Sequence, residues 1–173
     1  QTKIILMNQF IHRGKDKKKF VREMFDDISS SYDFLNKLLS LGVDSRWRKK
    51  FIDQIRLKDN NRVLDLATGT GDIAIKISKN KQVSVVGLDY SPKMIDVAQK
   101  KKNDMNIDNI EFIVGDAEEL PFKDNSFDVL TISFGLRNLG FYQKAFKEFY
   151  RVLKPGGSLH ILEFFSSEKT VFS

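Results

Sequence analysis

Glycines and carboxylates in the middle of the chain have the types and the spacing of a nucleotide-binding site. The segment Asp65-Leu-Ala-Thr-Gly69-Thr70-Gly71 places glycines where the backbone can approach a ligand closely. Asp89 follows about 20 residues later, where a carboxylate that binds ribose hydroxyls is expected. Because Gly69, Gly71 and Ala74 also fit the dinucleotide fingerprint, these features allow S-adenosylmethionine or NAD as the ligand, or a tight turn without any ligand.

A second acidic turn supports a nucleoside ligand. Asp116 and Ala117 follow a strand-like run over residues 110–114. The Asp116 carboxylate can accept a hydrogen bond from an adenine amino group, and the small Ala117 side chain leaves room for the ring. An acidic loop is otherwise usually a solvated turn, so this feature counts only together with the others.

The elements around these residues predict an α/β fold with a doubly wound, mostly parallel sheet. Strand-like runs alternate with helical patterns five times, with short connections. The expected strands cover residues 62–67, 83–88, 110–114, 127–134 and 158–165. Ligands of such sheets bind at the carboxyl ends of the strands, so we expect Tyr90 and the segment from Ser133 to Asn138 at the same site.

Helices before the first strand are expected to cover this site. Apolar residues recur every three or four positions from Phe20 onward, and Tyr32 lies on the apolar face. Asp33 is a candidate N-cap. Trp47 and Phe51 share a face of a further helix.

Composition fits a single globular domain and excludes several kinds of chemistry. The absence of Cys excludes disulfides, a thiol nucleophile and a cysteine-based zinc site, and the two His show no ligand spacing, so no metal site is expected. The net charge of +6 fits an anionic membrane surface, nucleic acid or no charged partner at all. The expected divisions are a flexible basic N-terminus (1–18), a helical cap (19–58) and the ligand-binding core (59–173).

Further segments give the chain a specific family resemblance. Over residues 62–165 it resembles class I S-adenosylmethionine-dependent methyltransferases, and over about 21–165 it resembles the ubiquinone/menaquinone biosynthesis C-methyltransferases. The segments that carry the closer resemblance are Phe25-Asp-Asp-Ile-Ser-Ser-Ser-Tyr32-Asp33, Leu35-Asn36, Trp47-Arg48, Asp65-Leu-Ala-Thr-Gly-Thr-Gly-Asp72, Ser133-Phe-Gly-Leu-Arg137-Asn138 and Leu162-Glu163-Phe164. The segment from Ser133 to Asn138 is the most specific, because generic class I enzymes vary there.

The resemblance implies S-adenosylmethionine as the cofactor and a position for each of its parts. By this analogy Asp89 holds the ribose hydroxyls, while Asp116 and Ala117 frame the adenine. The turn from Gly69 to Gly71 holds the methionine end, and Ser133 also contacts the cofactor. The complete expected cofactor site is Asp65, Gly69, Thr70, Gly71, Asp89, Tyr90, Asp116, Ala117 and Ser133.

The resemblance also implies methylation at a ring carbon of a polyprenylated quinol. That carbon becomes nucleophilic when the neighbouring phenol loses its proton. Arg137 stays protonated, so we expect it to donate hydrogen bonds to the developing phenolate or to orient a water, with Asn138 assisting. Tyr32 and Asp33 are candidates for proton removal or for contact with the ring.

Expected partners and location follow from the same resemblance. A polyprenyl tail requires access to a membrane, so we expect a cytoplasmic protein that contacts the membrane surface through its basic N-terminal stretch. A homodimer is left open. No nucleic acid is expected, because no Asn-Pro-Pro-Tyr-type sequence follows the fourth strand and there is no long basic stripe.

Family members continue through two further strands and a helix. The core is therefore expected to be truncated at its C-terminus, with the fifth strand as an exposed edge of the sheet. Two alternatives remain: a different class I methyltransferase that acts on a small molecule or a lipid, and a chain that binds S-adenosylmethionine or NAD without catalysis.

Overall fold

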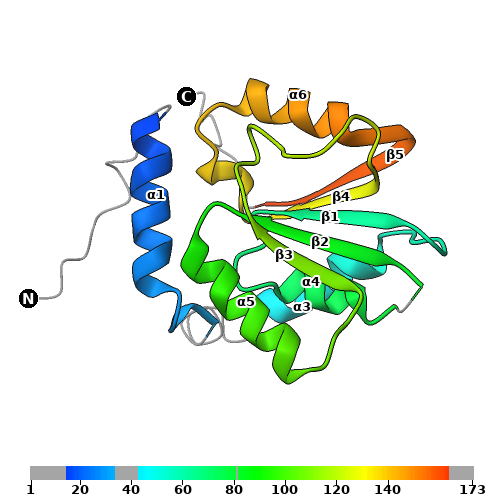
Figure 1. Ribbon diagram of the computed structural model, residues 1–173, viewed down its shortest axis with the longest axis horizontal. Helices are drawn as coiled ribbons and strands as arrows, with labels where there is room; N and C mark the ends of the chain where they lie inside the picture. Colours follow the sequence, from blue (N-terminus) through cyan, green and yellow to red (C-terminus); the bar gives the residue numbers. More distant parts are fainter. Residues whose placement is uncertain (1–14, 34–42, 81, 164–173) are drawn as a thin grey trace, which may run out of the picture.

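The computed structural model describes residues 15–33, 43–80 and 82–163, and a five-stranded parallel sheet forms its centre (Figure 1). The strands are β1 (Arg62–Leu66), β2 (Ser84–Asp89), β3 (Ile110–Val114), β4 (Phe127–Ser133) and β5 (Leu153–Leu162). Their order across the sheet is β3-β2-β1-β4-β5. The chain thus winds outward from β1 in one direction and then from β4 in the other, which confirms the predicted doubly wound fold.

The middle strands are apolar on both faces because helices cover both faces of the sheet. In β1, Val63, Leu64 and Leu66 are fully buried. Leu64 pairs in register with Val86 of β2 on one side and with Leu130 of β4 on the other. The run of apolar residues in β1 therefore specifies a central position in the sheet.

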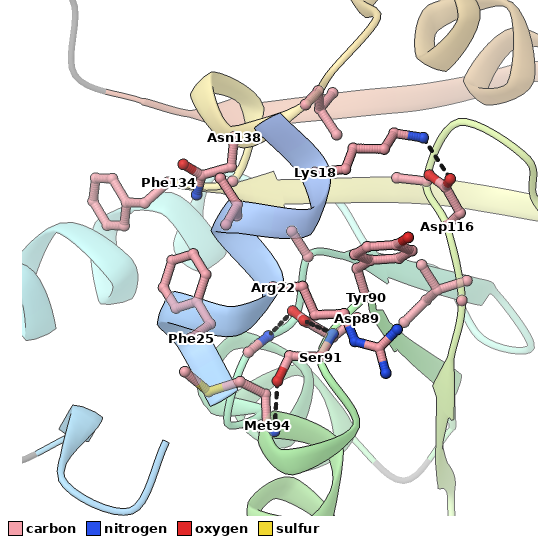
Figure 2. A pocket seen from close by; sticks show the side chains of 18 of the residues that line it. Lys18, Arg22, Phe25, Asp89, Tyr90, Ser91, Met94, Asp116, Phe134 and Asn138 are labelled. Carbon is pink, nitrogen blue, oxygen red and sulfur yellow. Dashed lines mark hydrogen bonds and ion pairs between the residues drawn. The ribbon is translucent and has the colours of Figure 1, made fainter. Parts of the chain in front are cut away.

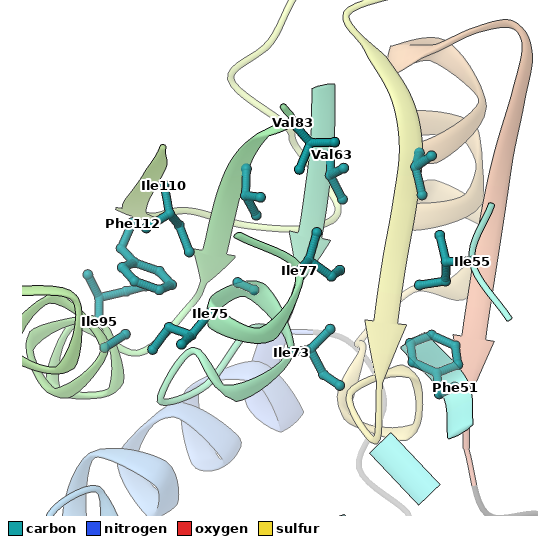
Figure 3. Close-up of a cluster of buried hydrophobic side chains, with 14 residues drawn as sticks. Phe51, Ile55, Val63, Ile73, Ile75, Ile77, Val83, Ile95, Ile110 and Phe112 are labelled. Atoms are coloured by element: carbon teal, nitrogen blue, oxygen red, sulfur yellow. The ribbon is translucent and has the colours of Figure 1, made fainter. Parts of the chain in front are cut away.

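Helices on the two faces enclose two separate cores. The helices α3 (Val43–Asp53), α4 (Asp72–Ser78) and α5 (Pro92–Asp104) lie on one face, and α6 (Tyr142–Val152) lies on the other (Figure 1). Figure 3 shows the first core, which extends from Phe112 of β3 past Ile77 of α4 to Phe51 of α3. Trp47, which was predicted on the same helix face as Phe51, is 42% exposed.

The helix α1 (Lys15–Ile28) stands across the edge of the sheet where the strands end (Figure 1). It begins five residues before Phe20, where the apolar pattern begins, so the lysine-rich segment that was predicted to be flexible is partly helical. The amphipathic pattern could not show this, because the first turn of α1 is held by charged contacts rather than by apolar ones. The helix expected after Asp33 lies outside the described residues.

The beginning of β5 differs from the prediction. Residues 154–157, Lys-Pro-Gly-Gly, were expected to end α6 and to precede the strand, but they lie within β5. Phe127 pairs with Leu153 and Val129 pairs with Ser158, so the residues between Leu153 and Ser158 form a bulge. Among the described residues, β5 is the edge strand on its side of the sheet, as expected.

Candidate functional site

A pocket lies between α1 and the carboxyl ends of β1 to β4 (Figure 2). It encloses about 760 Å³ including its open mouth. The expected site residues that line it are Tyr32, Gly69, Asp89, Tyr90, Asp116, Ala117, Ser133 and Asn138. These residues are far apart in the sequence, and the parallel sheet brings them together because all the strands end at one edge.

Asp89 joins the ends of β1 and β2 at the floor of the pocket (Figure 2). Its Oδ2 accepts a hydrogen bond from the Gly69 N–H at 2.7 Å, and its Oδ1 accepts one from the Ser91 N–H at 2.9 Å. Burial raises the pKa of the Asp89 carboxyl, although these backbone N–H groups act in the opposite direction. Ser91 in turn caps α5, as its Oγ accepts a hydrogen bond from the Met94 N–H at 3.1 Å.

The Asp65 side chain lies beneath the turn that follows β1 and stabilises its conformation through hydrogen bonds. The carboxylate is 1% exposed and accepts hydrogen bonds of 2.6 Å from the hydroxyls of Thr68 and Thr131. Burial raises the pKa of Asp65 to about 6, although the Thr131 and Thr68 hydroxyls lower it. Asp65 does not line the pocket, so its contribution to a ligand there would act through the turn.

The two glycines of the turn differ in what surrounds them. Gly69 adopts a φ of +56°, and a Cβ added there would meet no atom within 4 Å. Gly71 adopts a φ of +84°, and a Cβ added there would lie 2.6 Å from the Phe112 ring. Gly69 therefore leaves open space at the pocket, whereas Gly71 allows the start of α4 to pack against the sheet.

Asp116 is held by a lysine of α1 and is partly exposed to solvent. Lys18 places its Nζ 2.5 Å from Asp116 Oδ2 and 2.6 Å from Glu118 Oε2. Glu118 is fully buried, and its Oε1 accepts hydrogen bonds from the Gly140 and Phe141 N–H groups. Burial lowers the pKa of Lys18, but the hydrogen bonds to the two carboxylates outweigh it and the net shift is upward.

A second hollow, of about 320 Å³, lies beside the pocket and shares Tyr32, Ala67, Gly69 and Ser133 with it. Its remaining lining residues are Arg48, Asp65, Thr68, Thr70 and Ile73. Thr70 donates a hydrogen bond of 2.6 Å to Asp33, which also forms an ion pair with Lys101. The structure therefore places Tyr32 at both cavities, whereas Asp33 lines neither and contacts Thr70 of the second hollow.

Arg137 and Asn138 lie in the short helix η2 (Leu136–Asn138) after β4. Asn138 lines the pocket, whereas Arg137 does not, and the Arg137 side chain is 52% exposed. Its guanidinium forms an ion pair with Glu163, whose side chain is 3% exposed, and lies 6.0 Å from the centre of the Phe134 ring. Arg137 is thus fixed by a buried carboxylate beside the pocket.

The sequence predicted that N-terminal helices cover the site, but it did not predict which residues of α1 line the pocket. Lys18, Arg22 and Phe25 point toward the strand ends, and the Arg22 guanidinium lies 5.6 Å from the centre of the Tyr90 ring (Figure 2). The signal was present, because residues 18, 22 and 25 are spaced to lie on one helix face. It was obscured because a lysine-rich segment is usually solvated.

Comparison with known proteins identifies the relatives of the chain. A model of the ubiE/COQ5 methyltransferase family matches residues 12–173. The chain is 46% identical over 160 residues to the ubiquinone/menaquinone biosynthesis C-methyltransferase UbiE of Geobacter sp. strain M21, covering 91% of this chain and 68% of that protein. It is 45% identical over 150 residues to a demethylmenaquinone methyltransferase of Thermus thermophilus, covering 86% and 68% of the two proteins.

Solved structures give the same fold. A crystal structure of a SAM-dependent methyltransferase from Aquifex aeolicus matches with a TM-score of 0.65 and 27% identity, over 71% of this chain and 66% of that one.

Proposed function

The chain belongs to the ubiE/COQ5 methyltransferase family, and from this premise we propose that it transfers a methyl group from S-adenosylmethionine to a ring carbon of an isoprenoid quinol. The observation that carries the proposal is the pocket in which Asp89, Asp116 and Ala117 meet at the strand ends. The named relatives, UbiE and demethylmenaquinone methyltransferase, support a quinone precursor as the substrate. They also favour S-adenosylmethionine over NAD.

The residues present fit this cofactor. Asp116 and Ala117 follow β3, Asp89 ends β2 and the Gly69 turn follows β1, so that adenine, ribose and methionine could lie along one edge. Carboxylate oxygens suit the adenine amino group and the ribose hydroxyls. The open space at Gly69 leaves room for the chain that joins the ribose to the methionine group.

When bound, S-adenosylmethionine supplies a methyl group that is attached to a positively charged sulfur. The sulfur is a good leaving group when the methyl group is transferred. The contribution of the protein is to place a nucleophilic ring carbon in line with that methyl group, and such positioning can contribute about 7–11 kcal/mol. We assign Arg137, fixed by Glu163, to hydrogen bonding of the developing phenolate, and Asn138 to orienting the ring from the pocket wall. Tyr32 and Asp33 remain candidates for accepting the ring protons.

A labelled methyl-transfer assay tests the proposal. The protein is incubated with S-adenosylmethionine that carries a ¹³C-methyl group and with demethylmenaquinol of short tail length, and the product is examined by NMR. Label on a ring carbon supports the proposal. Transfer only to oxygen, or to an unrelated small molecule, supports the alternative of a different class I methyltransferase.

Contact with a membrane surface, a cytoplasmic location and a homodimer remain proposals. No helix among the described residues is long and apolar enough to cross a membrane. Two lysines of the basic stretch, Lys17 and Lys18, are directed into the protein, while the Lys19 side chain is 80% exposed. Co-sedimentation with anionic vesicles at low and high salt measures the membrane contact, and sedimentation velocity measures the dimer.

A further inference from the structure

A lysine in the first turn of α1 contacts the segment that carries Arg137 and Asn138. The Lys17 ammonium donates hydrogen bonds to the carbonyl oxygens of Arg137 at 2.7 Å and of Leu139 at 2.8 Å. It also lies over the Tyr142 ring, whose centre is 5.5 Å from Lys17 Nζ. Lys17 does not line the pocket, so its contacts act on the backbone beside the pocket rather than on a ligand.

The two carbonyl groups that accept from Lys17 belong to the residues on either side of Asn138. The segment closes its own turn, because the N–H groups of Asn138 and Leu139 donate to carbonyl oxygens three residues before them. The carbonyl groups of Arg137 and Leu139 come at the end of this turn, where the backbone offers them no donor within the turn itself. Lys17 supplies donors to both of them.

The same segment is held from its other side by Glu163, which follows β5. The Arg137 N–H donates to Glu163 Oε2 at 3.2 Å, and the Arg137 guanidinium pairs with Oε1 of the same carboxylate. The N–H of Arg137 is thus held from the sheet, and its C=O is held from α1. A change in the position of α1 would therefore act directly on the backbone between Arg137 and Leu139.

We propose that Lys17 is a positioning residue for methyl transfer, an inference that rests on the proposed function. By holding the carbonyl groups on both sides of Asn138, Lys17 fixes how the Asn138 side chain meets the pocket and where Arg137 lies beside it (Figure 2). Displacement of a reacting group by about 1 Å can cost about 10²-fold in rate. The seating of α1 over the pocket is thereby linked to the geometry of the groups assigned to the quinol ring.

Rate and affinity measured on the same variants test this inference. In Lys17→Met, kcat for methyl transfer to demethylmenaquinol is expected to fall by about tenfold or more. The Kd of S-adenosylhomocysteine should change by less than about twofold, because Lys17 does not line the pocket. Lys17→Arg keeps a cation that can donate to both carbonyl groups, so its kcat should recover to within about threefold of wild type.

A matched control and a spectroscopic readout accompany these measurements. Lys19→Met replaces a lysine of the same helix whose side chain is 80% exposed, and it should change neither kcat nor Kd. In ¹³C NMR, the carbonyl resonances of Arg137 and Leu139 should move upfield in Lys17→Met, which lacks the two hydrogen bonds, and stay in place in Lys19→Met. Lys17→Gln, whose amide does not reach as far as the ammonium, replaces Lys17→Met if that variant does not fold.

Near-normal kcat in Lys17→Met, no recovery in Lys17→Arg, or unshifted carbonyl resonances would each overturn the inference. Equal losses of kcat and of affinity for S-adenosylhomocysteine would also overturn it, because Lys17 would then only hold α1 in place. A wild-type protein that transfers no methyl group to demethylmenaquinol would instead contradict the proposed function, and with it the catalytic part of the inference. The carbonyl resonances would still show whether Lys17 holds the segment.

Discussion

Lys18 Nζ lies 2.5 Å from Asp116 Oδ2, so a helix at the start of the described chain is joined to the turn after β3. The same ammonium lies 2.6 Å from the buried carboxylate of Glu118. These contacts fasten α1 over the pocket and couple its position to the residue expected to bind adenine. Closure of the pocket therefore depends on a charged contact as well as on apolar packing.

Replacement of Lys18 by Met should loosen α1. The substitution leaves the fully buried Glu118 without its cation, which costs on the order of 1–3 kcal/mol. Hydrogen exchange should show faster exchange of the α1 amides, with those of β1 and β4 unchanged. Lys19→Met is the matched control, because the Lys19 side chain is 80% exposed and pairs only distantly, at 3.9 Å, with Glu23. Equal protection of α1 in both variants would show that the Lys18 contacts do not hold the helix.

The two glycines of the turn should respond differently to alanine. At Gly71 the new Cβ lies 2.6 Å from the Phe112 ring at a φ of +84°, so unfolding free energy should fall by about 2–4 kcal/mol. At Gly69 only the backbone penalty of about 1 kcal/mol applies, but the methyl group enters the pocket and should weaken cofactor binding. Urea denaturation and calorimetry on both variants measure the two effects. A larger loss of stability in Gly69→Ala, or weaker cofactor binding only in Gly71→Ala, would contradict the roles given to these glycines.

Asp65 should make stability depend on pH. Burial raises the pKa of its carboxyl to about 6, above the value of an unfolded chain, so the native state binds more protons between about pH 4 and 6. The contribution of the Asp65 carboxyl to the free energy of unfolding therefore falls as pH rises through that range. Its destabilising effect reaches its full size above pH 6. Asp65→Asn should therefore gain about 3 kcal/mol relative to wild type between pH 4 and 7.

Denaturant unfolding of wild type, Asp65→Asn and the surface control Asp59→Asn at several pH values measures this gain. The Asp65→Asn curve should diverge from wild type only above about pH 4, while the Asp59→Asn curve should follow wild type throughout. Parallel curves for Asp65→Asn and wild type would show that the carboxyl titrates alike in the folded and unfolded protein.

Arg137→Ala should lower methyl transfer far more than cofactor binding. Loss of one donor to a developing oxyanion typically costs about 10²–10³ in kcat, and Arg137 does not line the pocket. Arg137→Lys keeps the positive charge but loses the planar guanidinium that pairs with Glu163. Its turnover should therefore lie between that of wild type and that of Arg137→Ala. Near-normal turnover in both variants, with calorimetry showing intact cofactor binding, would remove Arg137 from the mechanism.

The sequence predicted most of the sheet because buried parallel strands have a strong signature. β3 was predicted with both ends correct, and β1 and β4 within one residue, since each is a short, mainly apolar segment between turn residues. The bulge that begins β5 was not predicted, because Pro155 and Gly156 are typical of a helix end and only pairing with β4 extends the strand through them.

The site was predicted where local motifs at strand ends specify it, as with Asp89 and Asp116. A helical cover over the pocket was predicted, but the contacts of Lys18 were not, since its partners are carboxylates that lie about 100 residues further along the chain. Asp65 was expected to contact the cofactor; it lines the second hollow, and its contacts with Thr68 and Thr131 hold it beneath the turn. Contacts between residues that are far apart in the chain produce no periodic pattern in the sequence from which they could be predicted.

The claim that this pocket binds S-adenosylmethionine is tested most directly by calorimetry of the 173-residue chain with S-adenosylmethionine and with NADH. We predict micromolar binding of S-adenosylmethionine, no binding of NADH, and a loss of about tenfold or more in Asp89→Asn, whose amide replaces the carboxylate that faces the ribose position. Binding of NADH alone, or of neither ligand to a chain with a folded circular dichroism spectrum, would contradict the account.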